Sequence, residues 1–534
     1  MRRPAFSFLA LWAVTLFLMG SGALSRALAN DESGPTAQAQ EAREDGGGPG
    51  RVVENGPPSG EEEGSPVTLG GRESGGSVAG DEILQVSLRE QLNEGLGTSL
   101  LGRLQAVLGL LVLGFLAWSL SVDRKNLAWR VILWGVGLQL AFALFILKTP
   151  VGAYLFEWLN TVVVSLLGFT VEGARFVFGD LVYNNVPVGL GEAGTSAPIQ
   201  EIPGQVARTG ASFAFNVLPT IIFFSSLMTV LYHLGVMQWV VRGVAWVMRK
   251  TMRTSGAETL SAAGNIFVGQ TEAPLLIRPF VERMTMSELN AVMTGGFATV
   301  AGGVMAAYVG MLVAYFPDIA GHLMAASVMS APAALVMAKL MYPEDGEPVT
   351  KGGVKLELER PDVNVIDAAA RGASDGLGLA LNVGAMLLAF IALISLLNAL
   401  ISWGGGLVGL EGLSLETILG WVLAPLAWLM GVPWVDAVTV GSLMGIKTVL
   451  NEFVAYLQLS SILQGGFGLQ PRSVVIAIYA LSGFANFSSI AIQLGGIGPM
   501  APSRRHDLSR VGLRAMVAGS LAAFMTATIA GMLL

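Results

Sequence analysis

The sequence predicts an all-α polytopic membrane protein with about eight transmembrane helices, interfacial helices and two re-entrant hairpins in an inverted repeat. Of its 534 residues, 53% are hydrophobic and 13% are charged, which is too apolar for an ordinary soluble domain. Basic residues gather at alternate ends of the apolar segments and indicate the cytoplasmic side. Polar, glycine-interrupted stretches occur at corresponding positions of two halves, a pattern typical of inverted repeats.

The composition excludes several kinds of chemistry. The chain has no Cys, so disulfides, thiolate nucleophiles and thiolate metal sites are absent. Its three histidines, His233, His322 and His506, are too dispersed to predict a multi-His metal site. No paired Asp, zinc-ligand spacing or Ser/His arrangement predicts catalytic residues, so we do not expect an enzyme.

The N-terminal region predicts export. Residues 1–29 read as a signal peptide, with an arginine pair before the apolar run Phe6–Met19 and an Ala-Leu-Ala sequence ending at Ala29. An uncleaved signal anchor is the alternative. Residues 30–82 hold twelve acidic residues against three Arg and predict a disordered tail outside the cytoplasm. The acidity of the chain therefore belongs to this tail and says nothing about what the membrane region binds.

Residues 83–253 predict a scaffold region that combines spans with interfacial helices. Spans are expected at Leu101–Ser121, Trp129–Leu147 and Phe213–Trp239. The mixed segment Asp81–Leu101 predicts an interfacial helix. Polar residues interrupt Val151–Asp180, which favours helices lying in the interface over a clean span.

Residues 254–345 predict the first repeat. The segment Thr254–Arg283 has cytoplasmic-type charge at both ends and therefore predicts a re-entrant hairpin, whose tip must be covered by protein or water. Leu289–Phe316 predicts a helix broken near its middle, since it is long and carries two Gly-Gly pairs. Ile319–Met341 predicts a return span.

Residues 346–434 predict a cytoplasmic loop, a scaffold span and a surface helix, and residues 435–534 predict the second repeat. The span is expected at Leu377–Ile401 and the surface helix at Leu415–Leu429. The second repeat contains three predicted elements: a hairpin at Val435–Leu463, a broken helix at Val474–Leu494 interrupted near Gly483, and a final helix at Met516–Leu533. Because the two hairpins enter from opposite sides, their polar tips should meet the two broken helices.

The polar residues of these tips are costly in a bilayer. A charged side chain at its centre costs roughly 2.5–3.5 kcal/mol, so Glu272 and Glu452 need a partner, a ligand or water. Structural ion pairs with Arg278 and Lys447 are one alternative to a binding role. For Asn486 and Ser489 in the second broken helix, hydrogen bonds between packed helices are the corresponding alternative.

Three stretches resemble signature motifs of the concentrative nucleoside transporter family, of the bacterial sodium-coupled type. They are Gly269–Leu275, Asn451–Phe453 and Gly483–Ser489, and the resemblance covers roughly Leu101 to the C-terminus. It implies a secondary active symporter that imports nucleosides with the sodium gradient by an elevator-like mechanism. It also implies a homotrimer in a bacterial inner membrane, with no nucleic acid partner.

The resemblance also implies which residues bind substrate. The nucleobase is expected to contact Gln270, Thr271 and Glu272, and the ribose to contact Glu452, Asn486 and Ser489, with Val304 and Phe484 lining the site. The chemistry agrees, because amides and hydroxyls can pair with a base edge and a carboxylate accepts strongly from ribose hydroxyls.

The same resemblance implies one sodium ion, the coupling ion, and no organic cofactor. It is expected at Asn265, Val268, Thr299 and Val300, largely through backbone oxygens, with Thr299 where the family commonly has Ser. Alternatives stay open: proton coupling through Glu272 or Glu452, and a nucleoside-recognition gate protein without transport. An intramembrane enzyme using either carboxylate as a base has no supporting constellation.

Overall fold

The computed structural model describes residues 100–183, 185–190, 200–208, 213–351, 362–407, 409–410, 412–465 and 468–534. The expected signal peptide 1–29, the acidic tail 30–82 and nearly all of the expected interfacial helix at Asp81–Leu101 lie outside this range. The described part is mostly helical and holds eight helices long and apolar enough to cross a membrane, which confirms a helical, polytopic membrane fold. The re-entrant hairpins and the inverted repeat stay predictions.

The N-terminal helices follow the apolar segments of the sequence. They are α3 (Leu100–Ser119), α4 (Trp129–Lys148), α5 (Pro150–Phe178), α6 (Leu218–His233) and α7 (Val236–Met252). Pro150 opens α5, where its missing N–H costs nothing, and the Thr149 side chain accepts from the Gly152 N–H at 3.0 Å. This cap separates α4 from α5 within one residue of the predicted boundary.

Val151–Asp180, expected to form helices lying in the interface, is one continuous helix of 29 residues, α5, and its placement in the interface stays a prediction. Another expectation for this region is wrong. The span expected at Phe213–Trp239 ends at His233, since Gly235 adopts a left-handed conformation (φ 85°) and starts a separate helix, α7. Trp239 therefore belongs to α7.

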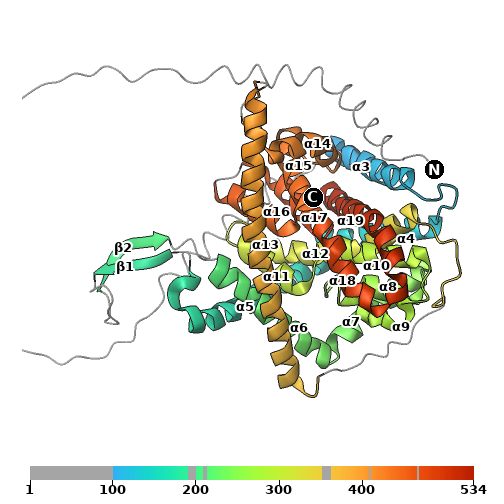
Figure 1. Cartoon of the computed structure of the whole chain (residues 1–534), viewed down its shortest axis with the longest axis horizontal. Coiled ribbons are helices and arrows are strands. Elements are labelled where there is room, and N and C mark those ends of the chain that lie inside the picture. Colours follow the sequence, from blue (N-terminus) through green and yellow to red (C-terminus); the bar gives the residue numbers. More distant parts are fainter. Residues whose placement is uncertain are drawn as a thin grey trace, which may run out of the picture. The chain divides into compact units, whose positions relative to one another are not determined.

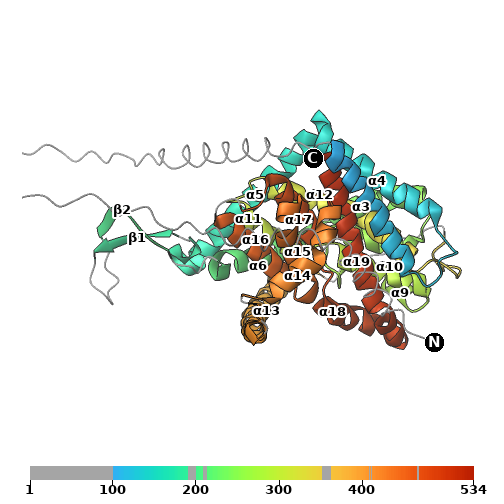
Figure 2. The ribbon, with the colours of Figure 1, turned by 90° about the horizontal axis from the view of Figure 1, so that it is seen from above.

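A short β-hairpin is the one departure from an all-helical fold in the described residues. Strands β1 (Asn185–Leu190) and β2 (Gln200–Arg208) pair antiparallel, with Asn185 opposite Arg208 and an irregularity between Pro187 and Gly189. The prediction missed it because both strands contain Pro and Gly, which weaken a strand pattern. Figures 1 and 2 show the paired strands in the green part of the chain.

The first predicted repeat has the expected sequence of elements. Helix α8 (Gly256–Gly264) and the short elements η3 (Ala273–Ile277) and α9 (Arg278–Val281) occupy the segment predicted to be the first hairpin, a name kept below for this segment. The broken helix follows as α10 (Met286–Ala298) and α11 (Gly302–Leu312), and α12 (Ile319–Met341) has the predicted bounds. Capping boxes at Ser255 and Thr285 start α8 and α10, with Glu258 and Glu288 completing them.

The segment predicted as the second repeat has the same order of elements. They are α15 (Trp434–Val449), α16 (Glu452–Gln464), α17 (Pro471–Leu481), α18 (Phe487–Ile497) and α19 (Arg505–Leu533), and the predicted surface helix α14 (Leu415–Leu429) precedes them. Helices α14 and α15 meet at a bend of 117°. The second hairpin is α15–α16, broken at Leu450 and Asn451, and α17 and α18 are the halves of the second broken helix.

Two helices are longer than predicted. Helix α13 runs over 43 residues from Val365 to Leu407, as Figure 1 shows, whereas the sequence predicts only its apolar part, Leu377–Ile401. Arg371 lies in the first turns of α13, before the predicted apolar part. It donates to both carboxylate oxygens of Asp362 at 2.5 and 2.7 Å, which lowers the pKa of Asp362 from its ordinary value. Helix α19 begins at Arg505 rather than Met516, since hydropathy does not detect its charged first turns.

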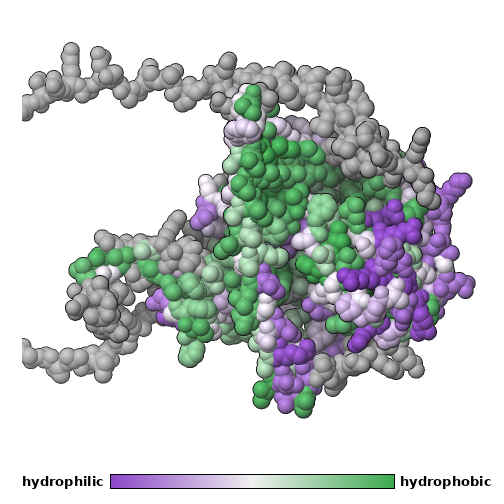
Figure 3. All heavy atoms as spheres, in the orientation of Figure 1, coloured by the Kyte–Doolittle hydropathy of each residue, from purple (hydrophilic) through white to green (hydrophobic). Residues whose placement is uncertain are grey.

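Burial separates inner from outer helices. In the most apolar part of each helix, 89% of the residues are buried in α12 but only 17% are buried in α13. Helices α10, α12, α17 and α19 pack against one another, while α13 packs mainly on α6. The apolar side chains exposed on α13 include Leu388 and Trp403, and Figure 3 shows hydrophobic atoms over this helix. Such a surface fits contact with lipid or with another subunit.

Candidate functional site

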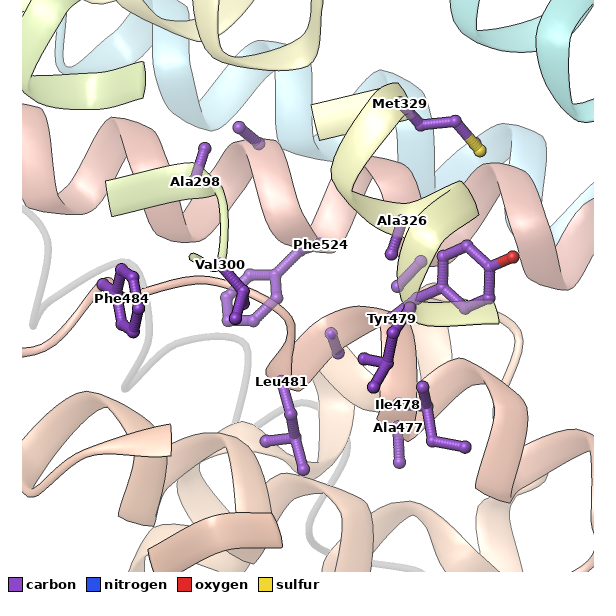
Figure 4. Packing of buried hydrophobic residues seen from close by; sticks show 14 of the residues in the cluster. Ala298, Val300, Ala326, Met329, Ala477, Ile478, Tyr479, Leu481, Phe484 and Phe524 are labelled. Carbon is purple, nitrogen blue, oxygen red and sulfur yellow. The ribbon is translucent and has the colours of Figure 1, made fainter. Parts of the chain in front are cut away.

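The two broken helices meet at their breaks. Gly483 lies in the segment between α17 and α18 with φ 139°, and a Cβ there would stand 2.8 Å from the Phe297 carbonyl oxygen and 2.9 Å from that of Ala298. Those carbonyls end α10, so only glycine permits this approach. In Figure 4, Ala298 and Val300 mark one break, and Leu481 and Phe484 mark the other.

The carboxylate of Glu452 is buried at the start of α16 and has two donors. The Tyr308 hydroxyl donates to its Oε1 at 2.9 Å, and the Asn486 Nδ2 donates to its Oε2 at 2.9 Å. Glu452 is the first residue of α16, where the helix dipole favours a negative charge. The second hairpin, the first broken helix and the second broken helix therefore meet at this carboxylate.

Asn486 connects Glu452 to Ser489. Its side-chain oxygen accepts from the Ser489 backbone N–H at 2.9 Å and from the Ser488 hydroxyl at 2.7 Å, which caps the N-terminus of α18. Asn451 caps α16 in the same way, by accepting from the Val454 N–H at 2.9 Å. Both half-helices thus begin with an Asn cap close to the predicted ribose contacts.

The tip of the first hairpin joins the same network. Gln270 is buried, and its Nε2 donates to the Ser489 hydroxyl oxygen at 3.2 Å. Gln493, one turn further along α18, donates from its Nε2 to the Gln270 Oε1 at 3.1 Å. A continuous path of hydrogen bonds thus runs from the first hairpin through α18 to Glu452 on the second hairpin.

The remaining predicted substrate residues are not part of this path. Thr271 packs against α18, where a Cβ at Gly496 would stand 2.5 Å from its Cγ2. Glu272 is exposed at the hairpin tip, and its carboxylate accepts a long bond of 3.4 Å from Thr271. Val304 on α11 and Phe484 are buried in the main apolar cluster.

The residues predicted to hold sodium fit a hard cation. Asn265 is fully buried; its Nδ2 donates to the Ser261 carbonyl at 3.1 Å, but its Oδ1 has no hydrogen-bond partner in the described part of the chain. Thr299 follows the end of α10 in an extended conformation and Val300 lies in the break, so unwound backbone is present there. An orphaned buried oxygen beside unwound backbone is what an oxygen-coordinated cation requires.

The alternative of simple ion pairs does not hold for the described residues. None of the ion pairs found there joins Glu272 to Arg278 or Glu452 to Lys447. Lys447 is fully buried, donates to the Ala480 carbonyl at 2.8 Å and lies 5.7 Å from the centroid of the Phe524 ring. It therefore caps the end of α17.

Sequence reasoning missed two residues of this network. Tyr308 is fully buried, stacks on Tyr456 with ring centroids 4.3 Å apart and donates to Glu452. Gln493 is fully buried between α18 and α10. A polar group within an apolar helix was the available signal for both, but it does not reveal which distant residue is contacted.

Three family models match consecutive parts of the chain. Residues 108–181 match the N-terminal model of Na⁺-dependent nucleoside transporters, and residues 322–531 match the C-terminal model of the same family. Between them, residues 214–315 match a model described as "Gate: Nucleoside recognition". Together the matches include both broken helices and most of the predicted site.

Curated relatives and solved structures agree. The chain is 42% identical over 438 residues to mouse sodium/nucleoside cotransporter 1, covering 80% of this chain and 63% of that protein. It is 41% identical to mouse sodium/nucleoside cotransporter 2, with coverage of 80% and 62%. The chain thus spans just under two thirds of the length of these relatives.

Two solved structures of CNTnw resemble the whole described fold. One is described as an inward-facing substrate-bound state, with a TM-score of 0.70, 42% identity and coverage of 80% of this chain and 97% of that one. The other is described as an outward-facing state, with a TM-score of 0.72, 41% identity and coverage of 81% and 98%. The chain therefore belongs to the sodium-dependent nucleoside transporter family.

Proposed function

We propose that this protein is a sodium-coupled symporter that imports nucleosides into the cytoplasm. The observation that carries the proposal is the hydrogen-bonded path from Gln270 through Ser489 and Asn486 to Glu452, which joins both hairpins. Amide and hydroxyl groups at one end suit a base edge, and the carboxylate at the other end suits ribose hydroxyls. The relatives named sodium/nucleoside cotransporter support sodium as the coupling ion.

The substrate site comprises residues from all four polar segments. Gln270, Thr271 and Glu272 contact the base; Glu452, Asn486 and Ser489 contact the ribose; Val304 and Phe484 line the site. The sodium ion is held by Asn265, Val268, Thr299 and Val300. The orphaned Asn265 oxygen supports the ion site, and the buried donors around Glu452 support the ribose site.

Transport follows from movement of the two repeats against the outer helices. The inner helices α10, α12 and α19 pack on one another and are mostly buried, so they can move as one body. The mostly exposed α13 is suited to a stationary scaffold. CNTnw structures described as inward-facing and as outward-facing support this elevator-like alternation, and the exposed apolar surface supports a homotrimer.

The location follows from charge. Basic residues between α3 and α4, at the end of α7 and at the start of α19 mark the cytoplasmic side, so the first hairpin enters from the cytoplasm and the second from the opposite face. The acidic tail 30–82 then lies outside the cytoplasm, after cleavage of the signal peptide 1–29. A bacterial inner membrane is the compartment that fits this arrangement.

Uptake into proteoliposomes tests the proposal. Radiolabelled uridine and adenosine should accumulate above the external concentration only with an inward sodium gradient, and replacing Na⁺ by choline should abolish accumulation. Equal accumulation in choline with an inward proton gradient would establish proton coupling instead. Specific binding of nucleoside without any accumulation would favour a nucleoside-recognition gate.

A further inference from the structure

Gln493 on α18 is fully buried against α10. Its Nε2 donates twice, to the Gln270 Oε1 at 3.1 Å and to the Met293 carbonyl oxygen at 3.1 Å. Glycine at position 296 of α10 makes room for it, because a Cβ there would stand 2.8 Å from the Gln493 Nε2 and 2.8 Å from the Gln270 Cβ. The two carboxamides are therefore packed against the same turn of α10.

The Met293 carbonyl fixes the direction of every hydrogen bond in this group. A backbone carbonyl can only accept, so Gln493 must turn its NH₂ group toward it. The same NH₂ group then faces Gln270, which must present its own oxygen. The Nε2 of Gln270 is left for the Ser489 hydroxyl, at 3.2 Å. Rotating the Gln270 amide by 180° would oppose the NH₂ groups of Gln270 and Gln493. The Ser489 hydroxyl can donate as well as accept and would tolerate either orientation, so the contact with Gln493 is the one that selects between them.

The second observation is that one polar atom of Gln493 stays unsatisfied. The Oε1 of Gln493 is buried and has no hydrogen-bond partner in the described part of the chain. An unsatisfied buried acceptor of this kind costs about 1–3 kcal/mol and persists where another requirement holds it in place. Holding Gln270 in one orientation is such a requirement.

We propose that Gln493 is a positioning residue that sets nucleobase selectivity, by fixing which end of the Gln270 amide donates and which accepts. The inference rests on the proposed function, in which Gln270 contacts the base. Nucleobases differ on one edge in this polarity: uracil has a carbonyl and an N–H where cytosine has an amine and an acceptor nitrogen. Hypoxanthine and adenine differ in the same way. A fixed amide distinguishes the members of each pair.

The test compares four nucleosides on purified full-length protein in Na⁺. Apparent affinities for uridine, cytidine, inosine and adenosine are measured for the wild type and for Gln493→Met, which keeps volume and removes the donor. The uridine/cytidine and inosine/adenosine ratios should each change by about three- to tenfold. The penalty for a 2′- or 3′-deoxyribose, which depends on Glu452 and Asn486, should stay the same.

Matched variants keep the outcome clear. Gln464→Met makes the same change at the exposed end of α16 and should leave all ratios unaltered. Gln493→Asn keeps an amide but shortens it by one methylene group; it should behave like Gln493→Met and decides the question if the Met variant does not fold. An equal loss of affinity for all four nucleosides would overturn the inference and indicate packing alone. Wild-type protein that binds no nucleoside would instead refute the proposed function.

Discussion

Glu452 is the residue on which the proposed chemistry depends most. Its two oxygens each accept one protein hydrogen bond, from Tyr308 and Asn486, and each keeps a second lone pair for a ligand. A buried carboxylate with two neutral donors is far better suited to accept from ribose hydroxyls than one neutralised by an ion pair. The position of Glu452 at the start of α16 adds a favourable helix dipole.

Glu452→Gln should therefore abolish concentrative uptake while the protein still folds and assembles. The new NH₂ group would face the Tyr308 or Asn486 donor, and charge-assisted bonds to ribose would be lost, so affinity should fall at least tenfold. Nucleoside binding and size-exclusion chromatography measure the two effects. Tyr308→Phe, which removes one donor but keeps the charge, should cost less; unimpaired uptake by the Gln variant would count against the ribose role.

Asn265 is the residue on which the proposed sodium site depends most. Asn265→Ala removes the orphaned buried oxygen, and the sodium concentration for half-maximal uptake should rise at least tenfold, because a hard cation loses an oxygen ligand. Sodium titration of uptake measures this. Asn290→Ala deletes another fully buried amide with an orphaned oxygen, but nine residues before the break in α10. It should leave sodium dependence unchanged, and an equal shift in both variants would refute the assignment.

Residue identities could be predicted in part from the sequence. The polar motifs identify Gln270, Glu452, Asn486 and Ser489, and the structure brings these side chains into one network. The sequence did not predict the contacts of Gln493 and Tyr308, because a polar side chain in an apolar helix indicates that a contact exists but not which residue makes it. Those partners are between 144 and 223 positions away in the chain, so only the packed structure identifies them.

The broken helices depend on backbone geometry that few residues adopt. Gly483 combines a positive φ with contact distances to the end of α10 that leave no room for a side chain. The sequence predicted an interruption near this glycine and another near the Gly-Gly pairs of α10–α11. It did not show that the two breaks touch each other, because that contact joins residues almost 190 positions apart.

Gly483→Ala should disturb both breaks together. The added Cβ would stand 2.8 Å from the Phe297 carbonyl in a backbone region that alanine avoids, so uptake should fall at least tenfold and the unfolding temperature should drop. Thermal unfolding and uptake are measured side by side. Gly495→Ala in α18 meets nothing within 4 Å and is the control. Wild-type behaviour of the Gly483 variant would show that the close approach of the breaks is not needed.

A buried ion network ties the first hairpin to its neighbours. Lys339 at the end of α12 lies 2.8 Å from Glu258 and 3.1 Å from Glu344, and it donates to the Ser287 hydroxyl at 2.9 Å. Ser255 in turn donates to Glu288 at 2.6 Å. The starts of α8 and α10 and the end of α12 are thereby joined, as a single moving body requires.

Lys339→Met should lower the free energy of unfolding by about 3–5 kcal/mol, because it leaves the Glu258 carboxylate buried without its partner. Thermal and denaturant unfolding in detergent measure the loss. Adding Glu258→Gln should restore part of it. Lys351→Met breaks a pair whose side chains are 76% and 93% exposed and should cost about 0–1 kcal/mol. Equal effects of both lysine changes would contradict the buried network.

The molecule as a whole divides into helices that the sequence predicts well and segments that it does not. The bounds of α12 match the prediction, and α4 differs by one residue, because each is a continuous apolar span. The length of α13 and the early start of α19 were missed, since their charged ends resemble loops to a hydropathy argument. The separation of α6 from α7 depends on one left-handed glycine and is invisible to composition.

The central claim is that the hairpin tips and the two breaks form one site that holds a nucleoside and a sodium ion together. Calorimetric titration of purified protein with uridine or adenosine, repeated at increasing Na⁺ with choline keeping ionic strength constant, tests it most directly. The account predicts that the nucleoside Kd falls as Na⁺ rises and that nucleoside raises the affinity for Na⁺ by the same factor. A nucleoside Kd that is the same in Na⁺ and in choline would contradict it.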